Sequence, residues 1–422
     1  MKKAAKITAS ILTAGILMTG CGAENVEPTL EEPTTTSLIG TTPSTDVTDV
    51  TTSDIEIPDA DPYLQFAIEM YAREAAVSDS NMMISPASIL IALSMTSSGA
   101  SGNTLTQMTD VLAPGMTPEE LQAFASAYQN KLNSASGIEM HSANSLWFNE
   151  NDPDSIYESY LDNVGTLYGA GINYIPMSSE GEEMINNWVS DETDGMIPYI
   201  LPDGTLDDST MAVLVNAIAF DAEWEGGELP ITEAVPFTNP DGTVTDVDMI
   251  TASVSDFFYT DDATGFLLGY EGGEYAFMAI LPGDAAVDAN TYASNMTEED
   301  YIEFWNSRST GSEVDIMLPE FSSDSFTTLS APLIDMGMTD AFSEGADFSE
   351  MTDRGMYIGE VYHSTHIDVD STGTTAAAAT AVVTYENCAE PNMSVTLNRP
   401  FVYAIVDVDT GFPIFIGTVN TL

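Results

Sequence analysis

Hydrophobic spacing divides most of the chain into two regions. Apolar residues recur at helical spacing from Asp61 to Asn133, whereas strand-like and helical patterns alternate from Ile138 onward. The turn signals Pro202-Asp-Gly204 and Pro240-Asp-Gly242 separate several of these patterns. Because no second linker and no internal repeat interrupts them, we predict a single α+β domain over residues 58–422, built around large sheets.

One segment near the C-terminal end, Ser371 to Thr384, contains no charged residue, no Pro and no aromatic ring. Its alanines alone would favour a helix, but the Thr and Val residues around them favour a strand. As a strand, it presents on one face Thr374, Ala376, Ala378, Thr380, Val382 and Thr384. Such a segment is able to enter a sheet between two strands without burying a charge. An Ala-rich helix or a flexible linker is the alternative interpretation.

The flanks of this segment favour the strand. His363 to Asp370 alternates between polar and apolar residues, and Asn398-Arg-Pro-Phe401 precedes the apolar runs Val402–Val406 and Pro413–Gly417. This order resembles the C-terminal part of a serpin: a strand, a hinge, an exposed reactive loop and a closing hairpin. On that resemblance the hinge consists of Gly373, Thr374, Thr375, Ala376, Ala377, Ala378, Ala379 and Thr380.

Further motifs resemble serpin landmarks in the same order along the chain. They are Asn81–Ser88 with Gly99–Thr104, Ala143–Trp147, Ile185–Trp188 with Thr193–Gly195, and Leu214–Ile218 with Trp224. The resemblance spans residues 60–422. It implies the serpin fold, in which several helices pack around large mixed β-sheets, and a serine protease inhibitor that is not itself an enzyme.

The resemblance also implies a group of residues that controls the opening of the central sheet. Four of them, Ser85, Ser88, Asn216 and His363, would form a buried hydrogen-bond cluster, and Trp224 would lie where the loop first inserts. Two positions depart from the pattern of inhibitory members, which usually carry Glu at the positions of Ser371 and Thr375. Thr375 suits a strand, whereas Ser371 removes a charge from the hinge.

The N-terminal residues predict export and anchoring. Residues 1–20 combine a basic start with an apolar stretch too short to span a membrane, and they end in a lipobox-like sequence before Cys21. We expect a bacterial surface lipoprotein acylated on Cys21; an ordinary secretory signal is the alternative. Residues 22–57 are rich in Thr, Asp, Glu and Pro and predict a disordered tether.

The charge balance is strongly acidic, with 67 Asp and Glu residues against 8 Lys and Arg. After the signal, the basic residues are only Arg73, Lys131, Arg308, Arg354 and Arg399. Such a surface repels nucleic acid, heparin-like polyanions and anionic membranes. We therefore expect a monomer without a heparin-like cofactor, which touches the membrane only through its lipid anchor. Cys388 is the one thiol besides Cys21, so no internal disulfide is predicted.

Little in the sequence supports an enzyme active site or a metal site. The chain has three His residues, and neither a Gly-x-Ser-x-Gly elbow nor a Gly-rich phosphate loop. Ser85 and Ser88 stand at a helix start, where hydroxyl groups usually cap the backbone. His366, Asp368 and Asp370 share one strand face, but a solvated face explains them better than a metal site. No cofactor and no metal is predicted.

The family spacing from Gly373 puts the attacked bond near Asn387, Cys388 and Ala389, with an uncertainty of one or two residues. No Lys or Arg lies between Thr374 and Asn398, so trypsin-like proteases find no basic anchor. Small residues suit the shallow pockets of elastase-like or subtilisin-like serine proteases, which we expect as targets. The competing hypotheses are a non-inhibitory serpin that acts as a chaperone or binding module, and a surface adhesin for cationic partners.

Overall fold

A computed structural model describes residues 62–135, 138–151, 155–207, 210–374 and 393–422, all of which belong to one unit of the chain, residues 44–422. Two sheets organise this part. The larger has nine strands: β1 (Met82–Ile84), β5 (Ile231–Thr238), β6 (Val244–Tyr259), β7 (Ala263–Gly269), β8 (Tyr275–Pro282), β9 (Ser309–Pro319), β13 (Met393–Thr396), β14 (Phe401–Asp407) and β15 (Pro413–Val419). Its order is β1-β15-β14-β8-β7-β6-β9-β13, with β5 paired to β6.

The second sheet has six strands in the order β10-β11-β12-β4-β2-β3. They are β10 (Phe321–Thr328), β11 (Tyr362–Val369), β12 (Gly373–Thr374), β4 (Ala212–Glu223), β2 (Ile138–Asn149) and β3 (Gly171–Ile175). β12 is antiparallel to both of its neighbours, β11 and β4. The strands on either side of β12 therefore run parallel to each other.

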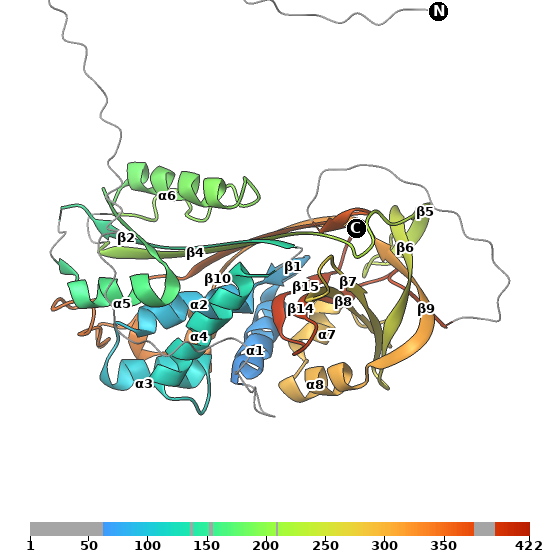
Figure 1. Cartoon of the computed structure of the whole chain (residues 1–422), viewed down its shortest axis with the longest axis horizontal. Coiled ribbons are helices and arrows are strands. Elements are labelled where there is room, and N and C mark those ends of the chain that lie inside the picture. The colour runs from blue at the N-terminus through green and yellow to red at the C-terminus, as the bar shows by residue number, and fades with distance from the viewer. Residues whose placement is uncertain (1–61, 136–137, 152–154, 208–209, 375–392) are drawn as a thin grey trace, which may run out of the picture. The chain divides into compact units, whose positions relative to one another are not determined.

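Helices cover both faces of the six-stranded sheet (Figure 1). On one face lie α2 (Pro86–Ser97), α4 (Pro118–Asn133) and α5 (Glu158–Tyr168), whereas α6 (Ser179–Glu192) lies on the other. The remaining helices are α1 (Pro62–Val77), α3 (Gly102–Leu112), α7 (Ala289–Ser294), α8 (Glu298–Asn306), α9 (Ser330–Met336) and the 3₁₀ turn Asp340–Phe342. None of the described helices is both long and apolar enough to cross a membrane.

Local sequence explains where α2 begins and why it is buried. Ser85 is its N-cap and accepts a hydrogen bond from the backbone N–H of Ser88, and Pro86 occupies the first turn, where its missing N–H costs nothing. The helix is apolar on nearly all sides, and Ile89, Leu90 and Ile91 are all buried. A helix of this kind belongs inside the core rather than on its surface.

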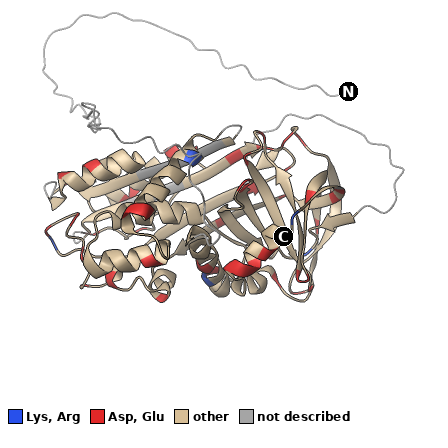
Figure 2. Cartoon of the chain, turned by 60° about the horizontal axis from the view of Figure 1, so that its bottom comes forward, with Lys and Arg blue, Asp and Glu red and all other residues tan. Residues whose placement is uncertain are grey.

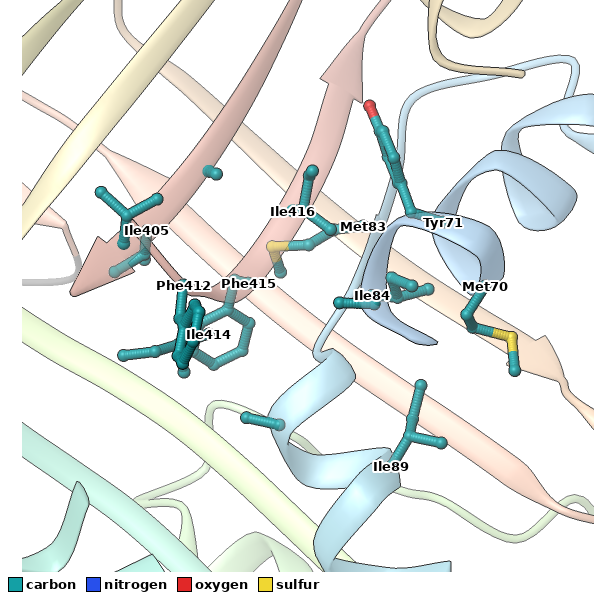
Figure 3. Packing of buried hydrophobic residues seen from close by; sticks show 14 of the residues in the cluster. Met70, Tyr71, Met83, Ile84, Ile89, Ile405, Phe412, Ile414, Phe415 and Ile416 are labelled. Atoms are coloured by element: carbon teal, nitrogen blue, oxygen red, sulfur yellow. The ribbon is translucent and has the colours of Figure 1, made fainter. Parts of the chain in front are cut away.

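The main core lies where α1, α2 and β1 meet the C-terminal hairpin β14–β15. Figure 3 shows this contact: Tyr71 and Ile84 approach from one side, and Ile405, Phe415 and Ile416 come from the hairpin. Every residue of β14 and β15 is buried, which explains why these strands read as continuous apolar runs instead of alternating. The predicted α+β fold with large mixed sheets is confirmed.

Candidate functional site: a hinge and a cavity between two strands

A tight turn joins β11 to β12 and builds the hinge. The Asp370 carboxylate accepts hydrogen bonds from the Thr372 backbone N–H at 2.7 Å, the Thr372 hydroxyl at 2.6 Å and the Gly373 N–H at 3.1 Å. The Asp370 N–H in turn donates to the Gly373 carbonyl at 3.0 Å. This is the usual way in which an Asp side chain imitates and closes a backbone turn.

The last two residues of the hinge that the structure describes already lie in the sheet. Gly373 and Thr374 pair with Glu223 and Ala222 of β4, and Thr374 also pairs with Val369 of β11. A Cβ atom at position 373 would stand 2.0 Å from the Ala222 carbonyl oxygen. Only glycine fits this close approach of two strands.

Trp224 holds the turn from the side of β4. Its indole is fully buried and stacks on Tyr270 at a centroid distance of 4.9 Å. The indole N–H donates to the Asp370 carbonyl at 2.8 Å, and the Trp224 backbone N–H donates to the Thr372 carbonyl at 3.1 Å. Thr374, whose side chain is buried, shares a 2.6 Å hydrogen bond with the Tyr270 hydroxyl. The turn is thus bound at several points along its length.

Ser371 stands where inhibitory members usually carry a hinge Glu, and a carboxylate from another part of the chain contacts it. Its backbone N–H donates to the Glu320 carboxylate at 3.0 Å, and its carbonyl accepts from the Leu229 N–H at 2.7 Å. Burial raises the pKa of Glu320, the hydrogen bond from Ser371 opposes that rise, and the nearby charges of Asp370 and Asp248 add to it. Glu320, between β9 and β10, therefore supports the hinge with a half-buried acceptor.

Beyond Thr374, in the direction in which β12 runs, a cavity lies between β4 and β11. Among the described residues, the only strand pairing between β4 and β11 runs through β12. The cavity has a volume of about 580 Å³ and is lined by both strands, by α2 on one face of the sheet and by the segment after α6 on the other. Its lining includes Ile89 and Leu93 of α2, Val213 of β4, His363 of β11, and Leu201. The cavity thus passes through the sheet at the position of an additional strand.

Next to this cavity lie three of the residues predicted to control sheet opening. The Ser85 N–H donates to His363 Nε2 at 2.9 Å, and the Ser85 hydroxyl donates to the Ile414 carbonyl at 2.8 Å while it caps α2 through the Ser88 N–H. Nε2 accepts a hydrogen bond, so His363 is neutral with its proton on Nδ1. Burial lowers the pKa of His363 to about 4.

The other two predicted control residues are Asn216, on β4, and Trp224, directly after that strand. Asn216 is on β4, where its backbone pairs with Asn144, and nothing further is described of its side chain. Trp224 stands at the hinge end of β4 rather than beside the cavity. The hinge positions Thr375, Ala376, Ala377, Ala378, Ala379 and Thr380, the reactive-bond candidates Asn387, Cys388 and Ala389, and the anchor Cys21 lie outside the described residues.

Sequence reasoning missed three residues of this site. The Asp370 turn had a detectable signal, because Asp-Ser-Thr-Gly is a typical turn sequence. Tyr270 and Glu320 had none, since they approach the hinge from other elements through tertiary contacts. No periodicity or spacing within their own segments marks them.

His366, on the strand face considered as a metal site, pairs with two carboxylates. His366 contacts Asp324 of β10 at 2.7 Å and Asp368 at 3.1 Å, whereas Asp370 serves the hinge turn. Although burial acts to lower it, the hydrogen bonds that the His366 ring makes to the two carboxylates raise the pKa of His366 overall. Within the described ranges, no group of three His, Cys, Asp or Glu side chains is arranged to hold a metal ion.

Charge on the described surface is predominantly negative (Figure 2). Lys131 on α4 contacts the buried carboxylate of Asp407, and Arg308 pairs with Asp256 at 2.7 Å while it lies over the Trp305 ring. The α4 region, which offers only Lys131, therefore has no basic surface of the kind that binds polyanions.

Comparison with known proteins places these features in one family. The family model described as serpin (serine protease inhibitor) matches residues 62–422. An uncharacterized serpin-like protein of Methanosarcina acetivorans is 30% identical over 352 residues, which cover 81% of this chain and 82% of the relative. Serpin B6 of Pongo abelii is 30% identical over 364 residues, which cover 83% of this chain and 96% of the relative.

Solved structures agree with this match. The thermophilic serpin tengpin in its native state has a TM-score of 0.77 and 35% sequence identity, covering 86% of this chain and 93% of tengpin. Thyroxine-binding globulin in complex with thyroxine has a TM-score of 0.74 and 25% identity, covering 85% of this chain and 98% of the globulin. The strand order, the hinge beside Trp224 and these matches over nearly the whole described region agree: the chain belongs to the serpin family.

Proposed function

We propose that this serpin inhibits elastase-like or subtilisin-like serine proteases by trapping them as covalent acyl-enzymes. The protease would attack the reactive loop as a substrate, and its serine would form an ester with the loop carbonyl. Cleavage would free the hinge, which would insert into the six-stranded sheet and carry the bound protease along. Inhibition then requires insertion to be faster than hydrolysis of the ester.

The observation that carries the proposal is the cavity between β4 and β11. Extending β12 at its present register would set Thr380 opposite His363, and Val383 opposite Val213. Both opposing residues line the 580 Å³ cavity. The reactive loop would therefore fill this space, gaining backbone hydrogen bonds on both sides and burying its apolar side chains.

The composition of the hinge supports the same conclusion. The Thr374 side chain points into the core, so in an inserted strand alternation would direct Ala376, Ala378, Thr380 and Val382 to the same face. None carries a charge, and residues 371–384 contain no Pro. A charge there would be buried without a partner, and Pro would remove a backbone donor from the new strand.

The test is incubation of the purified protein with elastase, subtilisin and trypsin, followed by denaturing electrophoresis. We expect a heavy band that survives denaturant with elastase or subtilisin and little with trypsin. Matched controls are the Ala378→Pro variant and a protease whose serine has been blocked beforehand, neither of which should yield the band. Mass spectrometry of the released C-terminal peptide should map the cleaved bond to Asn387, Cys388 or Ala389.

Other outcomes favour other functions. A clipped band without a complex would support a non-inhibitory serpin; Ser371, in place of the usual Glu, and the thyroxine-bound relative keep this candidate in view. Absence of any reaction would favour an adhesin for cationic partners. Fast complex formation with trypsin alone would overturn the choice of target class but not the inhibitory mechanism.

We further propose that the protein is held at the cell surface by a lipid on Cys21, with residues 22–57 as a tether. The support is the sequence of residues 1–21, in which a basic start, an apolar stretch and a small residue precede Cys21. In a bacterial host, the wild-type chain should fractionate with membranes and partition into detergent. Cys21→Ser should leave it in the soluble fraction or unprocessed, and equal membrane association of both forms would contradict the anchor.

A further inference from the structure

The hinge contains one hydrogen bond that joins the two sheets. Thr374 belongs to the six-stranded sheet, whereas Tyr270 lies in the turn between β7 and β8 of the nine-stranded sheet. Their hydroxyl groups are 2.6 Å apart, and both side chains are buried. The bond spans 104 residues of sequence, so it reports tertiary packing and not a local turn.

The surroundings fix Tyr270 rigidly. Its ring stacks on Trp224 with an interplanar angle of 8° and meets Phe220 edge-on at a centroid distance of 4.9 Å. The Tyr270 backbone N–H donates to the Tyr275 carbonyl at 3.1 Å, closing the turn between β7 and β8. The hydroxyl is thus presented at one fixed point, at the entrance to the open strand position.

Loss of this hydrogen bond would affect the two hydroxyl groups unequally. If the hinge left the sheet, the Thr374 hydroxyl would find water, whereas the Tyr270 hydroxyl would stay in the aromatic core. A buried hydroxyl that loses its partner is unfavourable, so Tyr270 favours the state in which Thr374 is inserted. Tyr270 is also bound to the hinge end of β4, through its bridge and ring stacking with Trp224, so the bond fixes Thr374 against both sheets.

We propose that Tyr270 is a positioning residue that captures the hinge through Thr374 before any cleavage occurs. It holds the first inserted residue, Thr374, in place. After cleavage, insertion would then continue from a residue that is already paired in the sheet. This proposal rests on the inhibitory function proposed above for its kinetic consequence. The capture itself is a property of the uncleaved protein and can be measured without a protease.

The experiment compares Tyr270→Phe, Thr374→Val and the double variant with the wild-type full-length protein. The matched control is Tyr403→Phe, because the Tyr403 hydroxyl is buried in the same core and has no hydrogen-bond partner among the described residues. The first readout is hydrogen exchange of the peptide that spans residues 370–375 in the uncleaved protein. The second is the number of inhibitor molecules consumed per protease molecule inactivated.

We expect exchange of the hinge peptide to be about three- to tenfold faster in each single variant, with no further increase in the double variant. The double variant should match the singles because the bond is already lost in each of them. Tyr403→Phe should exchange like the wild type, and thermal midpoints will show that all variants are folded. Consumption of inhibitor per protease should rise in parallel.

Unchanged exchange in Tyr270→Phe, or fully additive effects in the double variant, would overturn the capture. If the wild type forms no stable complex with any protease, the inhibitory function fails, while the exchange data still decide whether Tyr270 captures the hinge. If complexes form normally and exchange is unaffected, the inhibitory function stands and the capture is wrong.

Discussion

At the scale of single residues, His363 links burial to pH dependence. Its pKa is about 4 in the folded protein, against an ordinary value of 6.5. The unfolded chain therefore binds a proton before the folded protein does, and stability present above pH 6.5 is lost as the pH falls toward 4. Protonation of His363 would also break the hydrogen bond from the Ser85 N–H, because protonated His363 has no acceptor nitrogen.

We predict that this residue contributes up to about 3 kcal/mol to the fall in stability between these two pH values. Denaturant unfolding at a series of pH values measures it. His363→Gln, which retains a hydrogen-bond acceptor, should flatten the pH dependence, whereas His366→Gln should not flatten it because the pKa of His366 is raised. An equal pH slope in wild type and His363→Gln would contradict the assignment.

Glu320 is the second residue whose role can be tested alone. Glu320→Ala removes the acceptor for the Ser371 N–H and should lower the free energy of unfolding by about 1–2 kcal/mol. Glu320→Gln keeps an oxygen acceptor and should lose less. Urea unfolding of the uncleaved protein distinguishes the two, and equal losses in both variants would show that the charge of Glu320, not its acceptor, supports the hinge.

At the scale of elements, the strand alternation of the hinge makes a paired prediction. If the protein inhibits as proposed, Thr374→Arg should turn it into a substrate, because Thr374 is buried and a guanidinium there would have to be desolvated in the core. Thr375→Arg, one residue later, should retain most inhibition because alternation in an inserted strand would turn its side chain to the opposite face. The ratio of complex to clipped protein on a denaturing gel is the measurement. Equal complex formation by Thr374→Arg and the wild type would refute insertion.

The same alternation explains how well the elements could be predicted. The helical stretch before Asn133 and the later mixture of strands follow from hydrophobic spacing, and the strand from His363 to Asp370 corresponds to β11 (Tyr362–Val369). The N-cap at Ser85 was readable because Ser followed by Pro before an apolar run is a helix start. Strand order was not readable, since it depends on which apolar faces meet.

At the scale of the whole molecule, the proposed inhibitory function requires a fold held in a kinetic trap, with the cavity between β4 and β11 left open for the loop. Cleavage of the reactive loop should raise the thermal midpoint by on the order of tens of degrees, because the inserted strand fills the cavity and completes the sheet. Calorimetry of intact protein and of protein cleaved at the mapped bond measures this. Ala378→Pro serves as the control and should gain much less, and an unchanged midpoint in cleaved wild type would indicate an already relaxed fold.

The sequence by itself determined that the segment after Gly373 carries no charge that its insertion into a sheet would bury. Its small, uncharged residues after Gly373 restrict what the segment costs to bury, and this property is local. Tertiary structure alone decided which residues surround the place where the proposed insertion would occur. Tyr270, Glu320 and the cavity between β4 and β11 come from distant parts of the chain, and they meet because two sheets pack against each other. Periodicity records which face of an element is buried, but only packing determines which side chain stands opposite it.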